Sequence, residues 1–185
     1  MEKGLTVRKI VIAGVLGAIA ILLGVTRLGY IPVPTAAGNA TIMHIPAVIG
    51  GIMEGWGVGM IIGLIFGVSS FLNATVPLFK DPLVAILPRL FIGVTAYLTY
   101  VGLKNVNQYL AIGAAGFVGA LTNTVLVLGL AVIRGYMPFG VAATVAVTNG
   151  LPEAVVSVIV TLAVVAAWKK LGSSGRQKSK ISGDF

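Results

Sequence analysis

Six runs of apolar residues alternate with short polar or glycine- and proline-rich segments along the chain. The runs cover about residues 8–25, 41–52, 56–72, 83–103, 109–133 and 141–170. A transmembrane α-helix needs about 20 mostly apolar residues, and most of these runs reach or approach that length. The pattern predicts an all-α integral membrane protein, with six transmembrane helices in one membrane domain of residues 1–171.

The connections between these runs are short, with one exception. Residues 26–40 contain two prolines and two glycines and predict an irregular loop. The run that follows, 41–52, would form a helix only about 18 Å long, so we expect it to tilt or break. At the other end of the chain, residues 172–185 are polar and basic, which predicts a disordered tail.

Composition supports a membrane location. Hydrophobic residues make up 57% of the chain and charged residues 10%, with a mean hydropathy of +1.03. Soluble domains are about 45–50% apolar and 25% charged. The net charge of +8 does not indicate a nucleic-acid partner, because the basic residues flank apolar runs.

The distribution of basic residues predicts the orientation in the bilayer. The connections on the side opposite the two termini hold only Arg27, Lys80 and Arg134. Basic residues favour the cytoplasmic side, so both termini are predicted to be cytoplasmic. The basic start resembles a signal peptide, but Arg27, Tyr30 and two prolines before the next small residues favour an uncleaved first helix. The other connections and the two termini hold nine of the 13 basic residues: Lys3, Arg8, Lys9, Lys104, Lys169, Lys170, Arg176, Lys178 and Lys180.

The residue inventory excludes several kinds of chemistry. The chain has no cysteine and one histidine, so thiolate catalysis and a multi-histidine metal site are ruled out. It contains no Gly-Lys dipeptide and therefore no P-loop, so ATP would have to be used by a partner subunit. Ser69 and Ser70 lie in no recognisable nucleophile motif. An enzyme is not expected, and neither a metal nor a cofactor is predicted.

Small residues in two runs indicate close helix packing. Gly55, Gly59, Gly63 and Gly67 recur at every fourth position and predict a flat strip on one helix face. The first run carries two overlapping pairs with the same spacing, which serve either an intramolecular contact or the docking of another membrane subunit. These candidate docking residues are Ala13, Gly14, Gly17 and Ala18.

Polar residues inside the apolar runs point to a possible binding site. Ionisable groups in hydrocarbon are costly, and they usually mark a function or a mutual pair. Arg89 and Glu153 are the two embedded ones, and they either neutralise each other or face a solute. Thr122, Asn123 and Asn149 lie at a depth in the membrane comparable to that of Arg89 and Glu153. The candidate substrate-binding set is Asn39, His44, Arg89, Asn123, Asn149 and Glu153.

The chain resembles the substrate-binding S components of energy-coupling factor (ECF) vitamin transporters, from about residue 7 to 171. The resemblance is carried by RKIVIAGVLGAIAILL, NATIMHIPAVIGGIMEG, VGMIIGLIFGVSSFLNATVP and LPRLFIGVTAYLTY, in that order. It implies a six-helix protein in a prokaryotic plasma membrane that captures a vitamin from outside, beneath the first external loop. It also implies a transmembrane coupling (T) subunit and two ATPase subunits as partners.

The resemblance narrows two further expectations. The Ala-x-x-x-Ala docking motif of the family corresponds here to Gly14 and Ala18, with glycine in place of the first alanine. HIPAVIGGI and ILPRL are most similar to pantothenate-type members, where Arg89 would contact the carboxylate. Folate, cobalamin or another vitamin remains an alternative ligand. A structural or regulatory subunit without a ligand and a self-sufficient facilitator are alternative functions.

Overall fold

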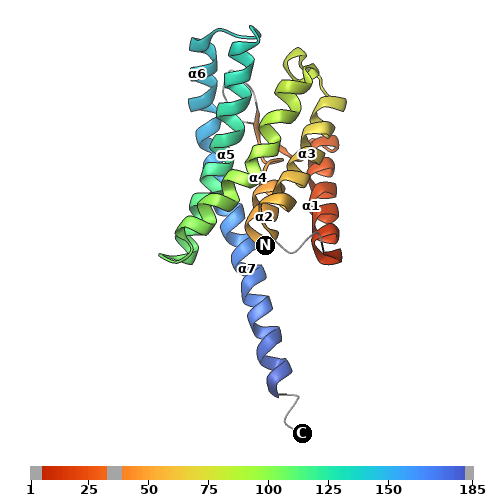
Figure 1. Cartoon of the computed structure of the whole chain (residues 1–185). Helices are drawn as coiled ribbons and strands as arrows, with labels where there is room; N and C mark the ends of the chain where they lie inside the picture. Colours follow the sequence, from red (N-terminus) through yellow and green to blue (C-terminus); the bar gives the residue numbers. More distant parts are fainter. Residues whose placement is uncertain (1–5, 33–38, 182–185) are drawn as a thin grey trace.

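The computed structural model describes the backbone of residues 6–32 and 39–181 and the side chains of residues 6–30 and 41–170. Within that part the protein is a helical bundle with one small pair of strands (Figure 1). The elements are α1 (Val7–Val25), β1 (Tyr30–Pro32), β2 (Asn39–Thr41), α2 (Ile45–Glu54), α3 (Trp56–Leu72), the 3-10 helix η1 (Pro77–Lys80), α4 (Pro82–Leu103), α5 (Gln108–Ile133), α6 (Phe139–Thr148) and α7 (Gly150–Ile181).

Among the described residues, four helical stretches are long and apolar enough to cross a membrane, and they confirm a membrane protein. They are Val7–Val25, Pro82–Leu103, Gln108–Ile133 and Phe139–Lys170. The helices α2 and α3 are also apolar but shorter. Because α2 has 10 residues, it is only about 15 Å long and does not cross a bilayer alone.

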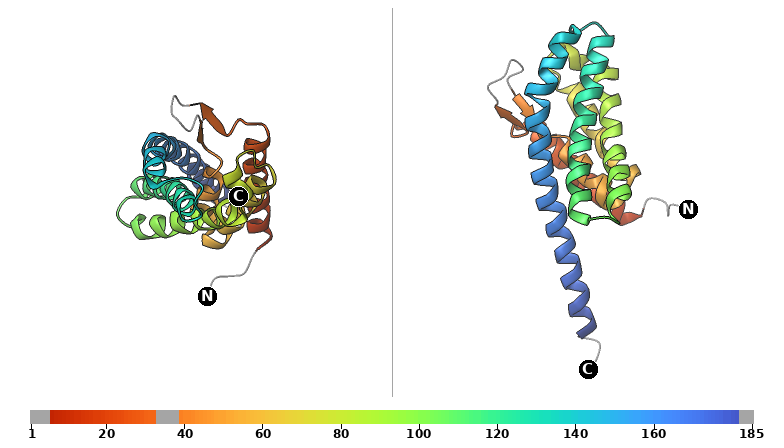
Figure 2. Two further views of the ribbon diagram at one scale, coloured as in Figure 1. Left: turned by 90° about the horizontal axis from the view of Figure 1, so that it is seen from above. Right: turned by 90° about the vertical axis from the view of Figure 1, so that its left-hand side faces the viewer.

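The bundle has two ends (Figure 1). At one end the start of α1 meets the turn between α2 and α3, where Arg8 and Glu54 form a 3.0 Å ion pair. The turn between α4 and α5 lies at the same end, and α7 runs out beyond it (Figure 2). We call this the terminal end. At the opposite end, Asp81 before α4 pairs with Arg134 after α5.

Glycine backbones bring α3 and α4 into close contact, as the small-residue spacing predicts. A Cβ added to Gly63 would lie 2.0 Å from the carbonyl oxygen of Arg89, and one added to Gly59 would lie 2.8 Å from the Cα of Gly93. Gly55 differs from the prediction, because it forms the turn between α2 and α3 with φ 103° and is not part of the α3 helix.

Two predicted runs differ from the observed helices. The run predicted from residue 41 begins as a helix only at Ile45, since Thr41 pairs with Tyr30 in the antiparallel β1–β2 ladder. Pro46, in the first turn of α2, favours a helix start there. The run 141–170 is broken between α6 and α7. Pro152 explains the break, because it has no N–H for Thr148 and its ring clashes with that carbonyl group.

The remaining differences lie at the end of the chain. The sequence predicted a disordered tail over residues 172–185, whereas α7 continues as a helix to Ile181. Lysine, arginine and glutamine in this stretch are good helix formers, and Gly172 and Gly175 do not end the helix. Residues 182–185 lie outside the described part.

Candidate functional site

Five buried polar side chains come from three helices and from the residue before a fourth. His44 precedes α2, Arg89 is in α4, Asn123 and Thr124 are in α5, and Glu153 is in α7. Each is at most 9% exposed. We call these five residues the polar cluster. His44 and Glu153 both interact electrostatically with Arg89. Thr124 interacts with Glu153, and Asn123 precedes Thr124 in the chain.

Arg89 is held in place by aromatic rings and one backbone bond. Its guanidinium carbon lies 5.4 Å from the centre of the Phe66 ring and 4.9 Å from that of Phe79. Its Nη1 donates a 2.5 Å hydrogen bond to the carbonyl oxygen of Val84. Both rings offer their faces to the cation. The arginine is therefore fixed in position while part of its hydrogen-bonding capacity stays available.

Glu153 binds the strand pair. Its Oε1 accepts a 2.6 Å hydrogen bond from the backbone N–H of Thr41 in β2. The backbone N–H of Glu153 donates to the carbonyl oxygen of Asn149, across the break between α6 and α7. Within the described part of the chain, the ion pairs are Arg8–Glu54 and Arg134–Asp81, so Arg89 and Glu153 have separate direct partners.

Several atoms of the polar cluster make no hydrogen bond of normal geometry to the described residues. Buried polar groups are nearly always hydrogen-bonded in folded proteins, to protein groups or to bound molecules. A group of them in one place offers donors and acceptors to a polar ligand. The atoms are Arg89 Nε, Asn123 Oδ1, Thr124 Oγ1 and both ring nitrogens of His44. No three metal-ligating side chains gather among the described residues.

Three other candidates have different positions. Asn149 caps the end of α6, is buried and has a partner of its own. The backbone of Asn39 is in β2, but its side chain lies outside the described residues. Thr122 does not face the polar cluster: its hydroxyl lies 2.9 Å from that of Thr95 in α4. Both threonines line an apolar groove of about 440 Å³ between α4 and α5.

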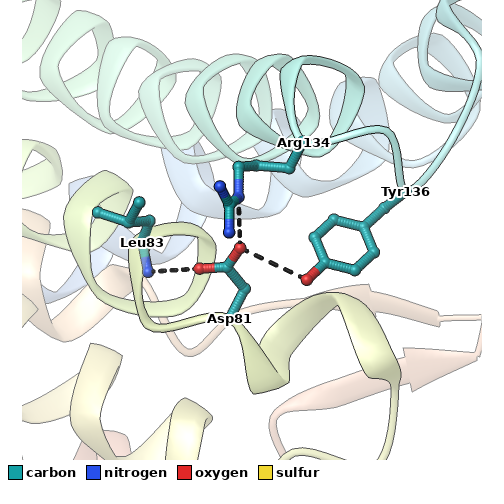
Figure 3. A network of polar contacts seen from close by, with 4 residues as sticks. All are labelled: Asp81, Leu83, Arg134 and Tyr136. Carbon is teal, nitrogen blue, oxygen red and sulfur yellow. Dashed lines mark hydrogen bonds and ion pairs between the residues drawn. The ribbon is translucent and has the colours of Figure 1, made fainter.

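At the end opposite the termini, a polar network centred on Asp81 joins the segment before α4 to the end of α5 (Figure 3). The Asp81 carboxylate caps α4 by accepting from the backbone N–H of Leu83 at 3.0 Å. It also accepts from Arg134 Nε at 2.7 Å, and the Tyr136 hydroxyl lies 3.4 Å away. Asp81 directly follows η1, which carries Phe79. The network thus ties the segment that covers the arginine to the end of α5.

Sequence reasoning missed this network, although the chain offers one signal for part of it. Asp81 stands before Pro82, and an aspartate before a proline is a typical helix start. No local pattern indicates Arg134 as its partner, since 53 positions separate the two. The roles of Phe66, Phe79 and Thr41 were also missed, because they depend on how the helices pack.

The Asp81 network predicts a specific dependence of stability on pH. The hydrogen bond from Arg134 is the main cause that lowers the pKa of the Asp81 carboxyl below its ordinary value. A pKa that is lower in the folded state stabilises the protein at pH values above the unfolded-state pKa of about 3.9. This contribution to stability is lost as the pH falls through the folded-state pKa. At pH 7 we expect the thermal midpoint of Asp81→Asn to lie below that of wild type. Below pH 4 the difference between the two midpoints should become smaller.

Thermal unfolding in detergent between pH 7 and pH 3 measures this gap. All other carboxyl groups are the same in both proteins, so the difference between the two curves isolates Asp81. Asparagine keeps a side-chain oxygen for the helix cap and removes the charge. Parallel curves across the whole pH range would contradict a role for the ionised carboxylate.

The small residues of α1 divide into two faces. Ala13 and Gly17 are buried, and a Cβ added to Gly17 would lie 2.7 Å from Ile65 of α3. Gly14 and Ala18 are exposed, and a Cβ added to Gly14 would meet nothing within 4 Å. The pair Ala13/Gly17 therefore serves packing within the chain, while Gly14/Ala18 leaves a flat strip open.

Fold and site together define a membrane-embedded binding subunit: a bundle of apolar helices that buries a polar cluster and contains no P-loop. Residues 8–165 match the family described as "ECF transporter, substrate-specific component". The chain belongs to this family of substrate-specific components, which work with the energy-coupling module of the transporter. It is a transport subunit and not an enzyme.

Two individual proteins illustrate the relationship. The chain is 34% identical over 156 residues to the pantothenic acid transporter PanT of Lactococcus lactis subsp. cremoris (strain MG1363), covering 70% of this chain and 78% of PanT. A solved structure of ThiT from Listeria monocytogenes has the same fold, with a TM-score of 0.57 at 15% identity. That match covers 90% of this chain and 95% of ThiT.

Proposed function

We propose that this chain captures pantothenate at the polar cluster and passes it across the membrane as the substrate-specific subunit of an ECF transporter. The observation that carries the proposal is the set of buried polar atoms, Arg89 Nε among them, that make no hydrogen bond of normal geometry to the described residues. The relative named as a pantothenic acid transporter supports the choice of vitamin.

The chemistry of pantothenate suits these side chains. The vitamin has a carboxylate, an amide and two hydroxyl groups. The Arg89 guanidinium is a charge-assisted donor for the carboxylate. Asn123 and Thr124 provide an acceptor and a hydroxyl for the polar middle of the molecule. His44 and the amide side chains of Asn149 and Asn39 complete the proposed contacts.

In this proposal Glu153 acts mainly through the β1–β2 pair. It accepts a hydrogen bond from the backbone of Thr41 in β2, which pairs with β1. A carboxylate that binds the strand pair would keep the two strands next to a bound vitamin. Its charge also balances Arg89 across the polar cluster. Glu153→Gln should therefore weaken binding less than a change at Arg89.

The proposed topology follows the family resemblance. We count α6 and α7 as one broken span, which gives six spans with both termini in the cytoplasm of a prokaryotic cell. The partners would be a transmembrane T subunit and two ATPases that use ATP. The exposed pair Gly14/Ala18 on α1 would dock to the T subunit.

Calorimetric titration of the purified protein in detergent tests the proposed ligand. Pantothenate should bind at a 1:1 ratio, whereas folate and cobalamin should give no signal at the same concentrations. Binding of folate or cobalamin in place of pantothenate would reassign the vitamin. Failure of every vitamin to bind would favour a structural or regulatory subunit, and transport by the chain alone in liposomes would favour a facilitator.

The two faces of α1 predict different outcomes for bulky substitutions. Gly14→Leu with Ala18→Leu should abolish co-purification with the T subunit and ATP-driven uptake, since leucine side chains prevent close backbone approach. Pantothenate binding by the isolated chain should stay unchanged. Gly17→Leu should instead lower the thermal midpoint of the isolated chain, because it collides with Ile65. Normal complex formation by the first variant would contradict the docking assignment.

A further inference from the structure

A cavity of about 580 Å³ lies at the terminal end of the bundle, away from the polar cluster. It is formed where the start of α5 faces the last membrane turns of α7. Its walls are Gln108, Tyr109, Ala166, Ala167, Lys169 and Lys170. Neither the proposed vitamin site nor the docking face of α1 uses these residues.

The cavity is positively charged. Lys169 donates a short hydrogen bond to the Tyr100 hydroxyl, and its ammonium lies 4.6 Å from the centre of that ring. Tyr100 is a neutral partner, so it orients the ammonium without cancelling its charge.

The start of α5 adds to this potential. The side chain of Asn107 caps the helix by accepting from the backbone N–H groups of Tyr109 and Leu110. The positive end of the α5 dipole therefore points to the side where Gln108 and Tyr109 line the cavity. Two lysines and a helix start that meet at one cavity favour an anionic ligand.

The surroundings of the cavity are those of a membrane interface. Tyr109, Leu110 and Trp168 are all more than half exposed around it. Tyrosine and tryptophan gather where lipid headgroups meet hydrocarbon. Ala166 and Ala167 leave an apolar wall next to the lysines, along which an acyl chain can lie. A soluble anion would use the charges but not this wall.

We propose that this cavity binds the headgroup of an anionic phospholipid, with Lys169 and Lys170 contacting the phosphate. Basic pockets between membrane helices at this depth suit such headgroups. The lipid would bridge the start of α5 and α7 at the level where α7 leaves the bundle. The inference is independent of the vitamin that the polar cluster binds.

Native mass spectrometry of the purified protein tests this proposal, with phosphatidylglycerol and phosphatidylcholine of identical chains added in turn. Phosphatidylglycerol should be retained at least tenfold more strongly. Each basic residue near an anionic lipid contributes about a fivefold change in affinity. Lys169→Gln with Lys170→Gln should therefore lower retention of phosphatidylglycerol by about 25-fold, while Lys169→Arg should retain it.

Two controls distinguish a specific lipid site from a general effect of charge and from a site for soluble anions. Lys9→Gln removes a positive charge from the same end of the bundle, far from the cavity walls, and should change retention less than twofold. Soluble glycerol phosphate should not displace the lipid at millimolar concentration. Equal retention of both lipids, an equal loss in Lys9→Gln, or displacement by glycerol phosphate would each overturn the proposal. Thermal unfolding verifies that every variant is folded.

Discussion

Replacing Arg89 with alanine is expected to weaken pantothenate binding by about 30-fold to several thousand-fold. Removing one partner of a buried, hydrogen-bonded charge pair costs about 2–5 kcal/mol, because the other charge is left without compensation. Arg89 is 4% exposed, and its Nε is free to donate. Titration of the purified variant measures the change. Arg89→Lys should give an intermediate loss, since lysine keeps the charge without the planar fork.

Two further variants decide what the arginine does. Lys80→Ala removes an exposed positive charge beside Phe79 at the same end of the bundle and should alter binding less than twofold. If Arg89 serves only to balance Glu153, the double variant Arg89→Ala with Glu153→Gln should recover both folding and binding. Recovery of full affinity in that double variant would contradict a direct contact between Arg89 and the vitamin.

Gly63→Ala is expected to be the most damaging small substitution in the bundle. The new methyl group would lie 2.0 Å from the carbonyl oxygen of Arg89, so α3 and α4 would have to separate. Overpacking of this kind typically costs about 1–3 kcal/mol, and the obstacle here is backbone, which cannot rotate away. The separation would also move the backbone of Arg89. We therefore expect lower thermal stability together with weaker pantothenate binding.

Gly57→Ala is the matched control on the same helix. A Cβ at Gly57 meets nothing within 4 Å, and alanine is a better helix former than glycine by about 1 kcal/mol. This variant should unfold at the same temperature as wild type or higher, with unchanged binding. Equal thermal midpoints for Gly63→Ala and Gly57→Ala would show that α3 and α4 are not packed backbone to backbone.

Much of the fold could be predicted because apolar runs and glycine spacing are local signals. The predicted ranges 56–72 and 83–103 lie within one residue of α3 and α4. The β1–β2 pair was not predicted, since each strand has three residues and one contains Pro32. The break before α7 was also missed, although Asn149-Gly150-Leu151-Pro152 holds the turn residues that cause it.

The site was only partly accessible from sequence. Ionisable and amide residues in apolar runs stand out, which is why Arg89, Asn123 and Glu153 were found. Their use as ligand contacts stays a prediction. Depth alone could not separate Asn123 from its neighbour Thr122, because the two differ in which helix they face. Nor could spacing separate the two faces of α1, since both pairs of small residues obey the same four-residue rule.

A structure of the protein determined with pantothenate tests the proposed site most directly. The vitamin should lie between the start of α2, α4, α5 and α7, with its carboxylate within about 3 Å of the Arg89 guanidinium. Asn123 and Thr124 should contact its polar middle. Density for the vitamin in the groove between α4 and α5, or a bound vitamin that leaves every atom of Arg89 untouched, would contradict the proposal.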